Sequence, residues 1–210
     1  MQEQLERATR DPLSEALLPV LVHRMNNTTQ LLSNLRSVLQ HAAGRDWLGE
    51  RAEDLAAAYR DLDDSGYLMA VLASASGADL LLDRREARGV ALMVSAVGEV
   101  IRREGGTFRE ACQPLPDQAP GVKDGWQLAW GVGALLLLSA RACGAQGTTF
   151  EWQLLEDSEA WVLVGSCVPS DGFASLAPTL AARLPEAALD VRREGWSWRL
   201  PAAWMRAASD

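Results

Sequence analysis

The residue with the clearest capacity for chemistry is His23, one of two histidines in this chain of 210 residues. Asn27, Gln30 and Asn34 follow it at positions i+4, i+7 and i+11, so on a helix the four polar side chains form one ridge, called the polar ridge below. A neutral imidazole nitrogen can attack a phosphoryl group, and Asn27 could hydrogen-bond a phosphoryl oxygen or orient a water molecule. On periodicity alone, a solvated surface histidine explains the same pattern. The other histidine, His41, is interpreted as a solvated residue near the C-terminus of the same helix.

Two apolar heptad seams predict that the helix carrying His23 is half of an antiparallel helical hairpin. Gly44 suits a helix C′ position and Asp46 an N-cap, so the chain turns between the seams and each helix spans roughly 28 residues. The first seam consists of Leu17, Leu21, Leu31, Leu35, Val38 and Ala42, and the second of Leu48, Ala52, Leu55, Tyr59, Leu62, Gly66, Met69 and Ala73.

A lone hairpin leaves one side of both seams in water, so we expect a second copy to cover them. The result is a homodimer with an intermolecular four-helix bundle. Between Leu21 and Leu31, the heptad spacing of the first seam places Arg24 and Thr28 at seam positions. These two polar residues either pair across the dimer or mark a loosened part of the bundle. Pro19 predicts a kink or a fresh helix start, with a helix that begins at Leu18 as the equal alternative.

The rest of the chain changes pattern. We expect helices over 86–103, 125–143 and 173–184, and strands over 107–113, 148–155, 160–168, 188–194 and 196–201, with a proline-rich loop over 114–121. This order predicts a two-layer α/β sandwich with helices on one face of a mixed sheet. The fold class is therefore α+β, with residues 1–78 as the hairpin and 79–210 as the sandwich.

Composition limits the partners and the compartment. The chain is 48% hydrophobic and 23% charged, which suits a globular protein, and its 20 Lys and Arg against 28 Asp and Glu argue against nucleic acid as a partner. Cys112, Cys143 and Cys167 form no C-x-x-C pair, so we expect buried thiols in a reducing cytoplasm. The charged N-terminus is unlike a signal peptide and the longest apolar run, 134–138, is too short to cross a membrane, so no membrane contact is expected.

With these elements in order, the chain resembles the catalytic body of bacterial sensor histidine kinases. The segment His23-Arg24-Met25-Asn26-Asn27 is similar to the family's H-box, H-E-L-N-N. The segment Glu194-Gly195-Trp196-Ser197-Trp198-Arg199-Leu200-Pro201 resembles the closing strand of its Bergerat-type ATPase domain, G-T-x-F-x-x-x-L-P. The resemblance implies a dimerisation and phosphoacceptor hairpin joined to an ATPase-like sandwich, with His23 as the phosphoacceptor.

The departures from the family concern ATP. The family has an acidic residue after the histidine, where this chain has Arg24, a cation that cannot accept a proton. The helix at 125–143 aligns with the N-box, whose asparagines hold magnesium and phosphates, yet Ser139 is its one remaining oxygen ligand. Where the family has D-x-G-x-G, this chain has Gly165-Ser166-Cys167-Val168-Pro169. A nucleotide site, and with it any metal or other cofactor, is therefore not expected.

A dimeric hairpin with an exposed histidine and a sandwich without its nucleotide site resembles the histidine phosphotransferases of the ChpT type. This resemblance implies that His23 relays a phosphoryl group between response-regulator receiver domains, which dock on Arg24, Gln30, Leu31 and Asn34 beside Asn27. Two alternatives stay open. One is a dimeric adaptor or pseudokinase that binds a response regulator without chemistry, and the other is a divergent sensor histidine kinase.

Overall fold

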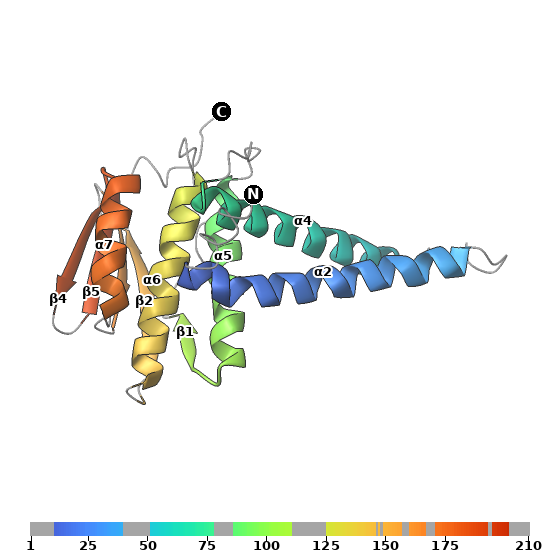
Figure 1. Ribbon diagram of the computed structural model, residues 1–210, viewed down its shortest axis with the longest axis horizontal. Coiled ribbons are helices and arrows are strands. Elements are labelled where there is room, and N and C mark those ends of the chain that lie inside the picture. Colours follow the sequence, from blue (N-terminus) through green and yellow to red (C-terminus); the bar gives the residue numbers. More distant parts are fainter. Residues whose placement is uncertain are drawn as a thin grey trace.

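The computed structural model describes residues 11–39, 51–77, 86–110, 125–145, 147, 149–156, 160–166, 171–192 and 195–201. Two long helices, α2 (Pro12–Leu39) and α4 (Ala52–Ala75), run side by side and project from the rest of the molecule as one arm (Figure 1). The remaining helices lie at the base of the arm and beside the sheet. They are α5 (Glu86–Arg103), α6 (Gly125–Ala145) and α7 (Asp171–Arg183).

The sheet has the strand order β1-β2-β3-β5-β4 and is mixed, as expected. Strand β1 (Phe108–Glu110) runs parallel to β2 (Phe150–Glu156), and the other neighbours, β3 (Ala160–Gly165), β5 (Gly195–Pro201) and β4 (Ala188–Arg192), are antiparallel. The strands expected over 148–155, 160–168, 188–194 and 196–201 correspond to β2, β3, β4 and β5, and the mixture of helices with a small sheet agrees with the α+β class. The predicted loop at 114–121 lies outside the described residues.

The arm and the sheet share one apolar core. Buried side chains at the base of the arm, among them Leu13, Leu17 and Leu68, belong to the same cluster as Met93 of α5 and Trp198 of β5. This cluster is called the shared core below. Because the base of the arm is buried in it, the position of the arm relative to the sheet is set by packing.

Helix α6 lies at the centre of the shared core, and two glycines allow its neighbours to approach. A Cβ at Gly131 would lie 2.8 Å from Trp198 Cη2 and 2.9 Å from Leu180 Cδ2. A Cβ at Gly133 would lie 2.6 Å from Met93 Cγ and 3.1 Å from Leu13 Cδ2. The two positions are about 200° apart around the helix, so the sheet side and the arm side are packed against opposite faces of α6.

The first turn of α2 is fixed by Asp11. Its carboxylate accepts hydrogen bonds from the Leu13 amide at 3.3 Å, the Ser14 hydroxyl at 3.0 Å and Trp130 Nε1 of α6 at 3.0 Å. The helix then continues through Pro19 to Leu39. The expectation of a fresh start at Pro19, or of a helix that begins at Leu18, is wrong, because this N-cap starts the helix at Pro12.

The buried stripe of α4 differs from the predicted second seam. The expected seam residues Tyr59 and Gly66 are exposed, whereas the buried α4 side chains lie one position earlier in that repeat, at Ala58 and Ser65, with Leu68, Val71 and Leu72 beyond them. Helix α4 has two neighbouring apolar stripes, and periodicity does not distinguish the one that faces α2. In α2 the predicted positions Leu17, Leu21 and Leu35 are buried.

Helix α6 also has the length and composition of a membrane span over Trp126–Ala145, in contrast to the expectation that the longest apolar run is too short. Of its most apolar window, 78% is buried inside the protein. Such burial is typical of the core helix of a soluble protein.

The expectation of free thiols is wrong for Cys143. This residue is 1% exposed near the end of α6 and is disulfide-bonded. Cys112 and Cys167 lie outside the described residues. Sequence spacing could not reveal the bond, because a disulfide depends on distances in the folded chain.

We expect Asp11→Ala to lower the free energy of unfolding by about 2 kcal/mol, because it removes the N-cap of α2 and the acceptor of the Trp130 indole N–H. Urea denaturation measures the loss. Glu15→Ala is the matched control, since it removes an exposed carboxylate from the same turn and should cost about 0.5 kcal/mol or less. Equal losses in the two variants would contradict this account of Asp11.

Candidate functional site

The candidate site lies on α2, on the part of the arm that leaves the shared core. His23, Asn27, Gln30 and Asn34 are all exposed, and Leu31 is half-buried beside them. The polar ridge therefore lies on the outer surface of α2, where a partner protein can reach it.

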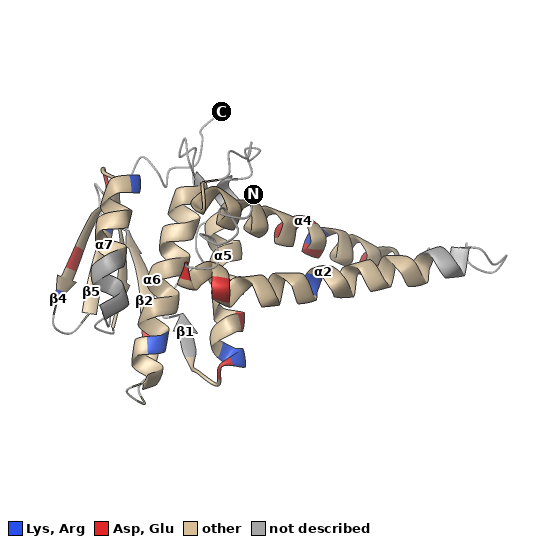
Figure 2. Ribbon diagram, viewed as in Figure 1, with Lys and Arg blue, Asp and Glu red and all other residues tan. Residues whose placement is uncertain are grey.

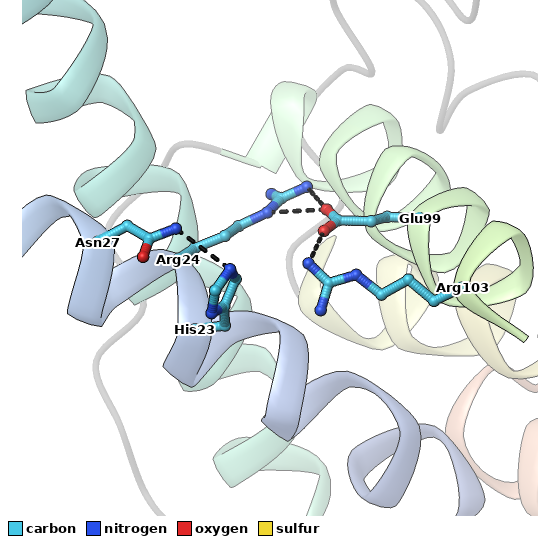
Figure 3. Close-up of polar contacts among 5 residues, drawn as sticks. All are labelled: His23, Arg24, Asn27, Glu99 and Arg103. Carbon is cyan, nitrogen blue, oxygen red and sulfur yellow. Dashed lines mark hydrogen bonds and ion pairs between the residues drawn. The ribbon is translucent and has the colours of Figure 1, made fainter.

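His23 contacts Asn27 one turn later. Asn27 Nδ2 lies 3.2 Å from His23 Nε2 (Figure 3). With the amide nitrogen facing the ring, Nε2 accepts the hydrogen bond and the ring proton resides on Nδ1. In this tautomer Nε2 carries the ring's available lone pair, and the Asn27 amide must release it before the nitrogen can act as a nucleophile.

Arg24 is paired with a carboxylate from another helix. Its Nε donates to Glu99 Oε2 of α5 at 3.0 Å, and its Nη2 contacts the same oxygen. Arg103 Nη2, one turn further along α5, donates to Glu99 Oε1 at 2.5 Å (Figure 3). Arg24, Glu99 and Arg103 form the cluster called the charged cluster below, which ties the helix of His23 to α5.

The charged cluster is partly shielded from water. The side chains of Arg24 and Glu99 are 28% and 21% exposed. Burial raises the pKa of the Glu99 carboxyl, but the hydrogen bond and charge of Arg24, together with Arg103, outweigh it, so the pKa lies below the ordinary glutamate value. Glu99 is therefore ionised at neutral pH.

Glu99 and Arg103 are the residues of this region that the sequence did not predict. Arg24 was expected among the docking residues and at an unexplained seam position. A cation at a seam position requires a carboxylate nearby, but Glu99 lies 75 residues away in sequence. The other polar seam residue, Thr28, is buried and donates its hydroxyl to the Arg24 carbonyl at 3.1 Å. Both seam residues are thus satisfied within one chain.

Helix α6, which the sequence resemblance aligns with the N-box, is covered by side chains of the protein itself. Ser139, its one candidate oxygen ligand, is fully buried and accepts a hydrogen bond from Trp196 Nε1 at 2.6 Å. Near the start of the helix, Arg183 of α7 stacks on Trp130, with 4.5 Å between guanidinium carbon and ring centroid, and on Trp126 at 5.6 Å. In the described part of the chain, no group of three or more His, Cys, Asp and Glu residues is placed to hold a metal ion.

The start of the segment that replaces D-x-G-x-G is also engaged within the protein. A Cβ at Gly165 would lie 2.5 Å from the Trp196 indole. Ser166 exchanges two hydrogen bonds with Glu151 of β2, each 3.0 Å long. Residues 167–169 lie outside the described residues.

Comparison with known proteins adds a distant likeness. The chain matches no protein-family model and no curated protein sequence. A solved structure of a bacterial phosphotransferase is similar to it with 15% identity and a TM-score of 0.31, over 89% of this chain and 94% of that chain. A likeness this distant does not carry an activity from one protein to the other.

We expect Glu99→Gln to destabilise the protein at neutral pH, because Arg24 and Arg103 lose their shared negative charge. Since folding lowers the pKa of Glu99, its stabilising effect is present above the ordinary glutamate pKa and is lost as the pH falls through the lowered value. The stability gap between wild type and variant should thus be constant above about pH 5 and shrink below about pH 4.3. Urea denaturation across this range measures it, and a gap that widens in acid would contradict the assignment.

Proposed function

We propose that this protein is a histidine phosphotransferase that relays a phosphoryl group between the receiver domains of response regulators through His23. The observation that carries the proposal is the exposed imidazole on the arm, whose Nε2 faces the Asn27 amide rather than the protein interior. A phosphoacceptor needs a ring nitrogen that a partner can reach, and the exposed Nε2 meets this need once the Asn27 amide releases it.

The transfer of the phosphoryl group to His23 needs no added base, because the ring does not have to lose a proton. The Nε2 lone pair attacks the phosphorus of an aspartyl phosphate on the donor receiver, an N–P bond forms, and the P–O bond to the aspartate breaks. The aspartate carboxylate leaves with the bonding electron pair, and the ring keeps its proton on Nδ1 as a phosphoimidazolium. The acceptor receiver reverses these steps with its own aspartate. Asn27 is then positioned to donate its amide N–H to a phosphoryl oxygen.

The environment of Arg24 favours phosphotransfer from a receiver domain over autophosphorylation by ATP. A sensor kinase would need a proton acceptor after the histidine, but the Arg24 guanidinium is committed to Glu99 and accepts no proton. The receiver supplies Mg²⁺ and its acidic cluster, so activation comes from the partner. The side chains that occupy the N-box helix support transfer without ATP, because Ser139 already has a hydrogen-bonding partner.

The surface next to His23 suits protein docking. From Met25 to Leu35, α2 has no charged residue, and Figure 2 shows this part of the α2 ribbon without red or blue positions. Gln30 and Asn34 are exposed and Leu31 is half-buried, so a partner can combine hydrogen bonds with apolar contact there. We assign this surface to the receiver domain.

The dimer is part of the proposal. A stripe of apolar and small residues follows the outside of the arm, where Val22, Leu32 and Tyr59 are 46%, 47% and 69% exposed. This outer stripe combines two heptad-spaced rows: Val22, Met25, Thr29 and Leu32 of α2, and Leu55, Tyr59, Leu62, Gly66 and Met69 of α4. A second copy that packs on the outer stripe would complete a four-helix bundle.

We expect phosphorylated receiver domains to transfer label to the wild-type protein and not to His23→Ala, because the variant has no nucleophilic nitrogen at this position. His41→Ala is the matched control and should accept label as wild type does. Radiolabel transfer followed by gel electrophoresis measures both. Label on His23→Ala would contradict the assignment. A wild type that binds receivers without accepting label would indicate an adaptor, and tight Mg-ATP binding by calorimetry would indicate a divergent kinase.

We expect the double variant Leu32→Lys and Tyr59→Lys to be monomeric at micromolar concentration, because two desolvated cations per chain oppose association. Sedimentation equilibrium measures the mass. Ala57→Lys is the matched control, since it adds the same charge at an exposed α4 position about 200° around the helix from Tyr59 and should stay dimeric. A monomeric wild type would contradict the dimer.

A further inference from the structure

Arg103 is the arginine of the charged cluster that has more unused N–H donors and the more exposed side chain. Arg24 uses its Nε and Nη2 on Glu99, whereas Arg103 uses only Nη2. A guanidinium has five N–H donors in a planar fork. The Arg103 side chain is 47% exposed, and within the described residues its other donors have no protein partner.

We propose that Arg103 binds a phosphoryl oxygen of phosphorylated His23, with Glu99 as the residue that holds Arg103 in place. This inference rests on the proposed function, because it assigns a ligand to the phosphorylated form of the same histidine. It adds a residue of the sandwich to the phosphoryl site, so that α2 supplies the nucleophile and α5 a stabilising cation.

Charge favours this assignment. The charged cluster combines two cations with one carboxylate and is therefore positive by one charge. His23 and Arg24 share one turn of α2, and Figure 3 shows the Arg103 guanidinium directed toward that turn, so the positive charge lies near the position where phosphorylation adds negative charge. A phosphoryl group on His23 would supply the negative charge that the charged cluster lacks.

Geometry favours it as well. Both oxygens of Glu99 are occupied, Oε2 by Arg24 and Oε1 by Arg103, so the carboxylate links the two guanidinium groups. Figure 3 shows the Arg103 guanidinium directed from α5 toward the turn of α2 that carries His23 and Arg24. Glu99 is 21% exposed, and its limited freedom reduces the entropy lost when Arg103 binds a phosphoryl oxygen.

The contact makes and breaks no covalent bond. An Arg103 N–H donates to one of the three phosphoryl oxygens after the N–P bond has formed, and Glu99 keeps its own hydrogen bond to Nη2. The phosphorylated state is stabilised relative to the free imidazole, and the dianionic phosphoryl group is stabilised relative to the monoanion. Arg103 therefore shifts both the phosphotransfer equilibrium and the protonation of the phosphoryl group.

The test uses the full chain with His41→Ala as background, so that His23 is the one remaining histidine. Potassium phosphoramidate, a small-molecule phosphodonor, phosphorylates histidine without a receiver domain. A ³¹P NMR titration then reports the protonation of the phosphoryl group. We expect Arg103→Ala to move the midpoint of this titration up by about 0.5 pH, and to lower the equilibrium level of phosphorylation by a receiver about threefold.

Two further variants keep the result specific. Arg102→Ala removes the neighbouring exposed arginine of the same turn and should leave the midpoint within about 0.1 pH of the background value, since the structure gives the Arg102 side chain no contact with the charged cluster. Arg103→Lys keeps the charge and should restore most of the shift. Equal midpoints in Arg103→Ala and the background overturn the assignment of Arg103, as does an Arg103→Lys variant that behaves as Arg103→Ala does.

The outcomes separate this inference from the proposed function. If receivers transfer label to His23 but the midpoint is independent of Arg103, this inference alone fails. If phosphoramidate labels His23 and the midpoint depends on Arg103, while no receiver transfers label, the relay fails and the phosphoryl contact stands.

Discussion

The close packing on both faces of α6 is the constraint on which the rest of the structure depends. Gly131 admits Trp198 and Leu180 on the face toward β5 and α7, and Gly133 admits Met93 and Leu13 on the face toward α5 and the arm. A larger side chain at either position would separate layers that now share one core. Since the base of α2 is buried in this core, and Asp11 also binds Trp130 of α6, the orientation of the first half of α2 is fixed. His23 lies one turn beyond the buried Val20, so its backbone is held in place while its side chain is exposed.

The elements of the fold were largely predictable because their signals are local. The helix expected over 86–103 matches α5 at both bounds, and the expected strands over 148–155, 160–168, 188–194 and 196–201 correspond to β2, β3, β4 and β5. The start of α2 and the buried stripe of α4 were not predicted. The start depends on the side chain of Asp11, whose hydrogen bond to Trp130 joins residues 119 positions apart. The stripe depends on which of two apolar rows faces α2, a choice that only the packed partner determines.

The candidate site divides in the same way. The polar ridge follows from helical spacing alone, and the structure places all four of its residues on the surface. The charged cluster could not be predicted, because its members come from two helices that meet only in the folded chain. Arg24 alone indicated that an ion pair exists, because a cation among apolar seam residues requires a negatively charged partner. The identity of that partner, Glu99, depends on how α5 crosses α2.

The same ion pair also links the arm to the part of the molecule that contains the sheet, because Glu99 of α5 holds Arg24 of α2. Without α5, Arg24 would occupy a seam position next to His23 with no carboxylate to satisfy it, and its side chain would be free to move beside the imidazole. With α5 present, Glu99 holds Arg24 in a defined direction and orders the surface around the imidazole. A small, pre-ordered surface loses less conformational entropy on docking than a mobile one. The sandwich therefore contributes to the polar ridge by restraining its neighbours, a role that depends on the packing of α5 against α2.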